Sequence, residues 1–122
     1  AKAQSALELG HLALAADDLD RARARYEEAA RLAADDALIP IRARSYIGIG
    51  RVLKRQEDLA GAARYFLSVA VLFDDPECVP ECLYEAGTLF DRLNRTEERD
   101  RAFRELAERY PESSWARRRA AP

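Results

Sequence analysis

The chain has 122 residues, of which 48% are hydrophobic and 34% are charged, and its formal net charge is −2. A chain of this length, with this proportion of hydrophobic to charged residues, is expected to form one folded domain whose core needs no disulfide or metal. The same composition excludes a disordered chain. Uninterrupted apolar runs are too short to span a membrane, and the slightly acidic charge argues against a dedicated nucleic-acid binder.

Apolar residues recur at helical spacing along the whole chain, and no stretch keeps the period of a strand. The pattern breaks at short clusters of Asp, Asn, Ser and Pro, and Asp and Ser accept the free N–H groups of a first helical turn. The pattern predicts six helices, at about residues 3–15, 18–33, 38–55, 58–72, 79–93 and 96–109, and a seventh that begins near Ser114. Because the loops are short, consecutive helices are expected to pack antiparallel as hairpins.

Three glycines inside predicted helices indicate an internal repeat. A glycine inside a helix costs about 1 kcal/mol relative to alanine, so close packing must offset that cost. The positions that recur are an alanine twelve residues after the first two glycines and an aromatic residue sixteen residues after all three: Gly10, Ala22 and Tyr26; Gly50, Ala62 and Phe66; Gly87 and Phe103. One helical hairpin therefore occurs three times, in which the glycine and the alanine let the two helices approach closely and the aromatic side chain fills the remaining space.

This spacing resembles the tetratricopeptide repeat. The matching residues are Tyr46, Ile49, Gly50, Leu53, Ala62 and Phe66 in the second copy, and Leu83, Gly87, Phe90, Phe103 and Pro111 in the third. The resemblance implies an all-α, right-handed α-solenoid of three hairpins in a single domain over residues 1–122. The repeats would cover about residues 3–36, 43–76 and 80–113, and residues 114–120 would begin a capping helix. In the third copy Arg99 replaces the small alanine that would pack between the two helices.

The stretch from Phe103 to Arg119 ends the third repeat. Pro111 blocks continuation of the helix, and Ser113 or Ser114 can cap the next one, so Trp115 is expected to fold back onto repeat three. The letters RYPESSWA at residues 109–116 also resemble bacterial cell-envelope repeat proteins. This resemblance favours the bacterial periplasm or envelope, with the cytoplasm as the alternative.

A repeat array needs a terminal helix over its last apolar face, and few residues follow Ser113. We therefore expect either a part of a longer array or a chain that covers its ends by self-association. The basic residues 117–119 are expected to form a solvated helix face.

The sequence shows no catalytic or metal-binding constellation. The single histidine, His11, falls on the first helix, where a surface or groove role is expected. Cys78, Cys82 and this histidine cannot complete a structural zinc site. The two cysteines are expected to be small buried side chains, and the alternative is a disulfide formed in an oxidising compartment. Gly48 and Gly50 are predicted to lie inside a helix, so they do not form a phosphate-binding loop. We therefore expect that the protein is not an enzyme and that it binds no metal and no cofactor.

A second stripe of residues on the first helix of each repeat would face the concave side, as the resemblance implies. The stripe is basic in its middle, and arginine suits carboxylates because it can donate two parallel hydrogen bonds. Its residues are His11, Arg44, Ile47, Arg51, Lys54, Arg55, Tyr84, Thr88, Asp91 and Arg92. The stripe predicts a groove for a partner peptide that carries acidic residues, with a solvated face rich in arginine as the alternative.

The function that these features favour is a protein–protein interaction scaffold without catalysis, whose partner presents an acidic or amphipathic segment. The alternative is a structural self-assembly element, a homo-oligomer within a larger bacterial complex. A helical-repeat RNA binder is supported only by the basic stripe, and the net charge and the scarcity of aromatic residues in that stripe oppose it.

Overall fold

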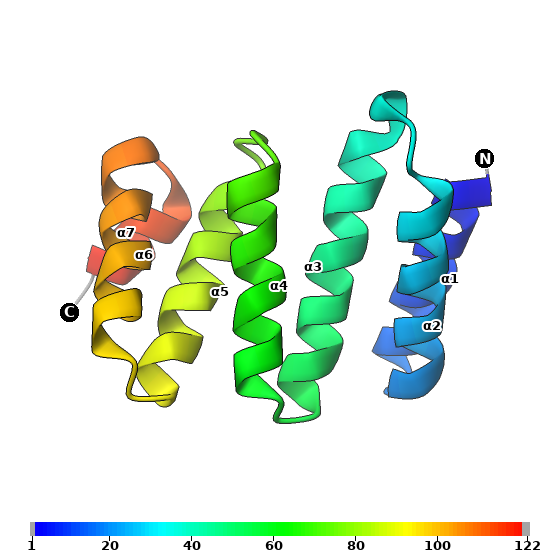
Figure 1. Ribbon diagram of the computed structural model, residues 1–122, viewed down its shortest axis with the longest axis horizontal. Coiled ribbons are helices and arrows are strands. Elements are labelled where there is room, and N and C mark those ends of the chain that lie inside the picture. The colour runs from blue at the N-terminus through cyan, green and yellow to red at the C-terminus, as the bar shows by residue number, and fades with distance from the viewer. Residues whose placement is uncertain (1, 121–122) are drawn as a thin grey trace.

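The computed structural model describes residues 2–120, and these residues form helices and no strand (Figure 1). The helices are α1 (Lys2–Ala15), α2 (Leu19–Leu32), α3 (Ile39–Arg55), α4 (Leu59–Leu72), α5 (Val79–Arg92), α6 (Thr96–Arg109) and α7 (Ser114–Ala120). The predicted helices are confirmed to within one or two residues at each end. A short 3-10 turn, η1 (Asp36–Leu38), precedes α3 and was not predicted. No helix in residues 2–120 combines the length and the apolar character needed to cross a membrane.

Each helix packs against the next one along the chain, from α1 to α6. Figure 1 shows them side by side in a row, with α2, α4 and α6 in front and α1 and α5 behind. Helix α1 also contacts α3, and α7 contacts both α5 and α6. We call the side formed by α1, α3 and α5 the odd face, and the side formed by α2, α4 and α6 the even face.

The aromatic residue of each hairpin lies directly against the repeat glycine. A Cβ atom at position 10 would lie 2.7 Å from the ring of Tyr26, and one at position 50 would lie 3.1 Å from the ring of Phe66. A Cβ at Gly87 would collide with the ring of Phe103. Tyr26 and Phe66 are completely buried. Glycine is therefore kept in these helices because a side chain would fill the space that the ring occupies.

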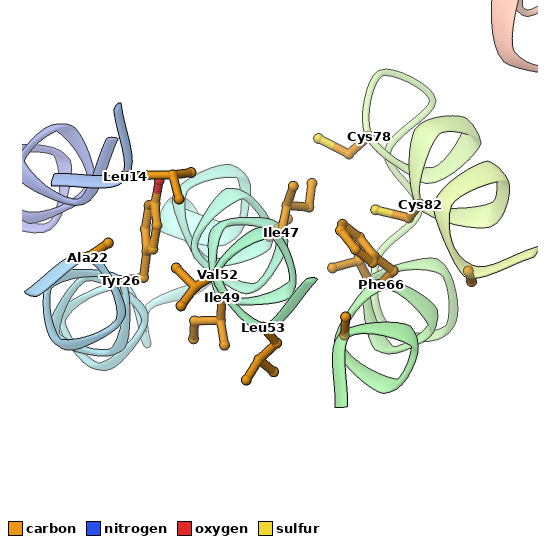
Figure 2. Packing of buried hydrophobic residues seen from close by; sticks show 14 of the residues in the cluster. Leu14, Ala22, Tyr26, Ile47, Ile49, Val52, Leu53, Phe66, Cys78 and Cys82 are labelled. Carbon is orange, nitrogen blue, oxygen red and sulfur yellow. The ribbon is translucent and has the colours of Figure 1, made fainter. Parts of the chain in front are cut away.

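Tyr26 also contacts a glycine of the following hairpin, which the sequence did not reveal. A Cβ at Gly48 would lie 2.5 Å from the Tyr26 ring. The ring is thus enclosed between Gly10 on α1 and Gly48 on α3, and Figure 2 shows it between the helices of the first hairpin and α3. One aromatic side chain therefore joins the first two hairpins.

The three hairpins also share one backbone turn between their two helices. The residue seven positions after each repeat glycine has a left-handed backbone, with φ of 59° at Asp17, 63° at Glu57 and 60° at Asn94. The next residue's N–H donates to the carbonyl five residues earlier at 2.9 Å in all three turns. This bond closes the end of the first helix, as in the Schellman motif. The repeat is therefore present in the backbone as well as in the core.

The start of the second helix differs in the third hairpin. Asp18 and Asp58 begin α2 and α4, and their carboxylates accept the N–H groups of Arg21 and Gly61. At the same place Arg95 gives α6 no side-chain cap. Asp caps of this kind are worth about 1 kcal/mol, so α6 lacks a stabilising contact that α2 and α4 have.

The last helix covers the end of the third hairpin, which confirms the expected position of Trp115. Trp115 packs with Tyr84 and Phe103 against a small core cluster that contains Leu83 and Leu106. Ser113 caps α7 by accepting the N–H of Ala116 at 3.0 Å.

The basic residues of α7 are exposed, as expected, but they also contact aromatic rings. The guanidinium of Arg118 lies 4.8 Å from the ring centre of Trp115, and that of Arg119 lies 4.4 Å from the ring centre of Phe103. Cations placed over aromatic faces in this way are attracted by the ring. These contacts therefore help to hold α7 on the third hairpin.

Candidate functional site

Two adjoining hollows lie on the odd face. The first has a volume of about 360 Å³ and is lined by Arg51, Lys54, Arg55, Glu57, Glu81, Glu85 and Arg92. The second has a volume of about 260 Å³ and is lined by His11, Arg44, Ile47, Arg51, Glu77, Cys78 and Glu81. The structure thus brings together seven of the ten predicted groove residues. Arg51 and Glu81 line both hollows, so the two form one continuous surface across α1, α3 and α5.

Three basic residues of α3 on this surface are paired with carboxylates of α5 and of the turn before it. Arg51 lies 2.8 Å from Glu81, and Lys54 lies 2.9 Å from Glu85. A longer pair of 3.5 Å joins Arg44 to Glu77. In addition, Arg92 on α5 lies 3.1 Å from Glu57 after α3. Ion pairs therefore connect α3 to α5 along the length of the odd face.

Glu77 and Glu85 are not among the predicted groove residues. The signal that could have found them is their four-residue spacing on either side of Glu81, since Glu81 and Glu85 lie on one side of α5 and Glu77 stands in the turn just before that helix. Five cations and four carboxylates line the two hollows. The surface is consequently of mixed charge and close to neutral, where the sequence alone indicated a basic stripe.

In the two shortest pairs the carboxylate lies deeper than the cation, whereas Glu77 and Glu57 are more exposed than their partners. The side chains of Glu81 and Glu85 are 23% and 17% exposed, whereas those of Arg51 and Lys54 are 42% and 40% exposed. The cations therefore cover the acids and keep solvent-facing donors, since a guanidinium has five N–H groups and an ammonium has three. A partner's carboxylate can bind these donors without first breaking every internal pair.

His11 forms the α1 side of the second hollow. Its Nδ1 lies 2.7 Å from the hydroxyl oxygen of Tyr26, which is completely buried. A buried hydroxyl needs an acceptor for its proton, so Tyr26 donates and the neutral imidazole accepts. This bond fixes the tautomer of His11 and leaves its Nε2–H as a donor on the odd face.

The pKa of His11 is lowered, first by its partial burial and then by the positive charge of Arg51. The carboxylate of Glu8 acts in the opposite direction. The lowered pKa keeps the imidazole neutral at pH 7, as its hydrogen bond with Tyr26 requires. The expected groove role of His11 is compatible with this arrangement.

Arg55 makes a structural contact as well as lining the first hollow. Its guanidinium donates to the carbonyl oxygen of Leu14 at 2.6 Å and lies 3.6 Å from the carboxylate of Asp17. Carbonyl groups in the last turn of a helix lack partners within the helix, and a cation at that end is favoured. Arg55 thus ties the end of α1 to the end of α3.

The predicted residues on α5 are engaged by the chain itself. The ring of Tyr84 lies 5.2 Å from that of Trp115, and Arg118 lies over its face. Thr88 donates its hydroxyl to the carbonyl of Glu85. Asp91 holds Arg99 at 2.7 Å. This ion pair explains why position 99 can carry an arginine where the repeat pattern has a small alanine, because the arginine side chain extends outward to Asp91.

Cys78 and Cys82 are free and buried, which confirms their interpretation as small core side chains. Figure 2 shows both extending from the start of α5 toward the side on which Ile47 lies. Burial raises the pKa of Cys78 to about 11 and raises that of Cys82 as well. Both thiols are therefore protonated at neutral pH, which makes them poor nucleophiles and poor metal ligands. Within residues 2–120 no cluster of three or more potential ligands could hold a metal ion.

No family model matches this chain, and no curated protein matches it. The three hairpins can still be compared with one another. Their glycine–ring contacts and helix ends agree, whereas the side chains that they expose differ. Where equivalent exposed positions carry different residue types in the three hairpins, the fold does not depend on the side chain at that position.

Proposed function

We propose that this protein is an α-solenoid of the tetratricopeptide type that acts as a protein–protein interaction scaffold. It binds an extended or helical segment of a partner protein on the odd face and carries out no catalysis. The repeated glycine–ring contacts and the three equal turns support the solenoid, since a hairpin that repeats its packing adds each copy in the same orientation.

The observation that carries the binding role is the continuous surface formed by the two hollows. Side chains of all three hairpins line it, and Arg51 and Lys54 are two-fifths exposed while paired with more deeply buried carboxylates. Preorganised charges of both signs suit a partner segment that carries acidic residues beside apolar or basic ones. Affinity on the order of micromolar, about −8 kcal/mol, is typical of such a module.

The near balance of charges on the odd face supports this role over RNA binding, which draws its affinity from an excess of cations. The bacterial envelope remains our proposal for its location, on the resemblance of residues 109–116.

A photoreactive residue at position 92 tests the binding role. Arg92 lines the first hollow, is half exposed, and makes only one surface ion pair in residues 2–120, so replacing it leaves the fold intact. Position 55 is less suitable because Arg55 closes the end of α1. The matched control is the same photoreactive residue at position 104, which is exposed on α6 of the even face.

In lysate of the source organism, position 92 is expected to capture one partner protein and position 104 is not. The captured segment, made as a peptide, should then bind the purified protein and lose about tenfold in affinity on Arg44→Gln with Arg92→Gln. Capture only from position 104, or capture of nothing by folded protein, would overturn the odd-face proposal.

A further inference from the structure

The outer side of α1 exposes apolar residues at positions that the other two hairpins bury. Figure 1 shows α1 and α2 at one end of the row of helices. On α1, Ser5, Leu9 and Leu12 are separated by four and three residues, which places them in one row along the helix. Leu9 is 44% exposed and Leu12 is 67% exposed. We call Ser5, Leu9, Leu12 and the neighbouring Glu8 the α1 end face.

The equivalent residues are buried in both hairpins that follow another hairpin. Helix α2 packs against α3, and α4 packs against α5. Counted from the repeat glycines, the positions of Ser5, Leu9 and Leu12 are at most 2% exposed in both later copies: Ser45, Ile49 and Val52 on α3, and Cys82, Ala86 and Leu89 on α5. Figure 2 shows Ile49 and Val52 extending from α3 toward Tyr26 of α2. The α1 end face therefore carries the same kinds of side chain as an interface between two hairpins.

The two ends of the row differ in how they are covered. At the far end α7 packs on α5 and α6, and Trp115 lies against the apolar cluster of the third hairpin. Within residues 2–120 no helix covers Leu9 and Leu12 in this way, since both are exposed. The outer face of a terminal repeat is normally polar, because solvent covers it. Apolar residues on the α1 end face therefore indicate an interaction surface.

Glu8 indicates which charge the covering element carries. Counted from the repeat glycines, Glu8 corresponds to Glu85 on α5. The Glu85 carboxylate is 17% exposed and lies 2.9 Å from Lys54 of the preceding hairpin. Glu8 accepts a hydrogen bond from Gln4 at 3.1 Å and joins no ion pair within residues 2–120. An element that covers α1 as the second hairpin covers α5 would therefore bring a cation to Glu8.

We propose that the α1 end face binds an amphipathic helix of a partner protein. The bound helix packs on α1 as α4 packs on α5, with an apolar stripe over Leu9 and Leu12 and a basic side chain beside Glu8. A hollow of about 490 Å³ offers space for its apolar side chains, and the lining includes Ala6, Leu9 and Leu32. The partner segment is helical because the elements that cover α3 and α5 are helices.

The expected affinity follows from the size of the α1 end face. Helix α1 has 14 residues and is about 21 Å long, so one docked helix buries less than an interface of standard size. We therefore expect a dissociation constant in the micromolar range. The residues of the α1 end face line neither hollow of the odd face, so this inference does not depend on the odd-face proposal.

A fusion tests whether the α1 end face accepts a helix in this way. A copy of residues 38–77, placed directly before residue 1, puts a second α4 ahead of α1 with the 37-residue spacing of Gly50 and Gly87. In the present chain Leu12→Glu should shift the thermal midpoint by no more than about 2 °C, because the residue is exposed. In the fusion it should lower the midpoint by at least about 5 °C, because the carboxylate is then buried against the copied α4. The matched control is Val71→Glu, at a position that is 75% exposed on α4, and it should be neutral in both proteins.

A photoreactive residue at position 12 seeks the partner itself, with position 104 on α6 as the control. In lysate of the source organism, position 12 is expected to capture a helical segment that has an apolar stripe and a basic residue. That segment, made as a peptide, should bind the purified protein and lose at least about tenfold in affinity on Leu12→Glu. Glu8→Lys should also weaken binding, and a peptide whose basic residue is changed to glutamate should restore it.

Three results would overturn the proposal: Leu12→Glu as neutral in the fusion as in the present chain, no capture at position 12 by folded protein, or a captured peptide that binds the Leu12→Glu variant equally well. Capture of a second copy, or of an earlier segment of the same polypeptide, would likewise assign the α1 end face to the array itself. Because position 92 reports on the odd face and position 12 on the α1 end face, failure of one proposal is distinguishable from failure of the other.

Discussion

Glu81 on α5 lies 2.8 Å from Arg51 on α3 and is the more buried of the two, with 23% of its side chain exposed against 42%. The pair joins the second hairpin to the third and lies where the two hollows of the odd face meet. The same contact therefore serves both the packing of neighbouring hairpins and the charge pattern of the proposed binding surface.

The stability that this pair contributes should be small. Because both side chains are partly solvated, a double-mutant cycle of Arg51→Gln and Glu81→Gln should give a coupling of about 0.5–1 kcal/mol. Urea denaturation of the four proteins measures it, and 1 M salt should reduce it by screening. A coupling above about 3 kcal/mol, insensitive to salt, would contradict the pair's partial exposure.

The contact between Gly48 and Tyr26 should be far more sensitive to substitution. Gly48→Ala would place a methyl group 2.5 Å from a ring enclosed on both sides, and it should destabilise the fold by about 1–3 kcal/mol. The matched control is Gly50→Ala, whose methyl group would lie 3.1 Å from Phe66. There the gain in helix propensity, about 1 kcal/mol, should offset most of the strain. Equal free energies of unfolding for the two variants would refute the close approach at Gly48.

The helices and the recurring glycine, alanine and aromatic positions could be predicted because each depends on residues within one hairpin, at fixed spacing. Contacts between hairpins could not. The partners of Arg51 and Lys54 are about thirty residues away, and the second glycine at the Tyr26 ring belongs to the next hairpin. The sequence of one helix alone therefore predicted a basic surface, although the neighbouring helix supplies carboxylates to the same surface.

The left-handed turn at Glu57 offers a stabilising substitution. A residue with a Cβ atom is disfavoured at a φ of 63° by about 1–2 kcal/mol, and glycine is not. Glu57→Gly loses a surface ion pair with Arg92 and adds flexibility to the unfolded chain, so a net gain of about 0.5–1 kcal/mol is expected. Asn94→Gly should gain less, because asparagine tolerates this conformation better than glutamate. Thermal unfolding compares the two, and a loss of stability in Glu57→Gly would contradict the prediction.

The two thiols should be unreactive in the folded protein. Burial raises the pKa of Cys78 to about 11 and that of Cys82 further, so little thiolate exists at pH 8. A chromogenic disulfide reagent should label both cysteines only as fast as the protein opens, and at once in denaturant. Added urea below the unfolding transition should accelerate labelling in step with the opened population. Immediate labelling of one thiol in native conditions would show that its side chain is accessible.

The single histidine allows the charge of the odd face to be measured directly. The pKa of His11 is lowered by partial burial and by Arg51, and it is raised by Glu8. Arg51→Gln should therefore raise the pKa toward its ordinary value of about 6.5, and Glu8→Gln should lower it further. The imidazole proton signals of the only histidine, followed by NMR against pH, report each value.

The lowered pKa also sets the sign of the pH dependence of folding. Between the folded pKa and the ordinary value of about 6.5, the unfolded chain binds more protons than the folded one. The contribution of neutral His11 to stability is therefore complete above pH 6.5 and is lost as pH falls toward the folded pKa. Protonation also removes the acceptor of the Tyr26 hydroxyl. His11→Gln should reduce the loss of unfolding free energy that occurs as the pH falls below 6.5. If His11 instead titrates above 6.5 in the folded protein, stability would rise as the pH falls, and Tyr26 could not be the hydrogen-bond donor.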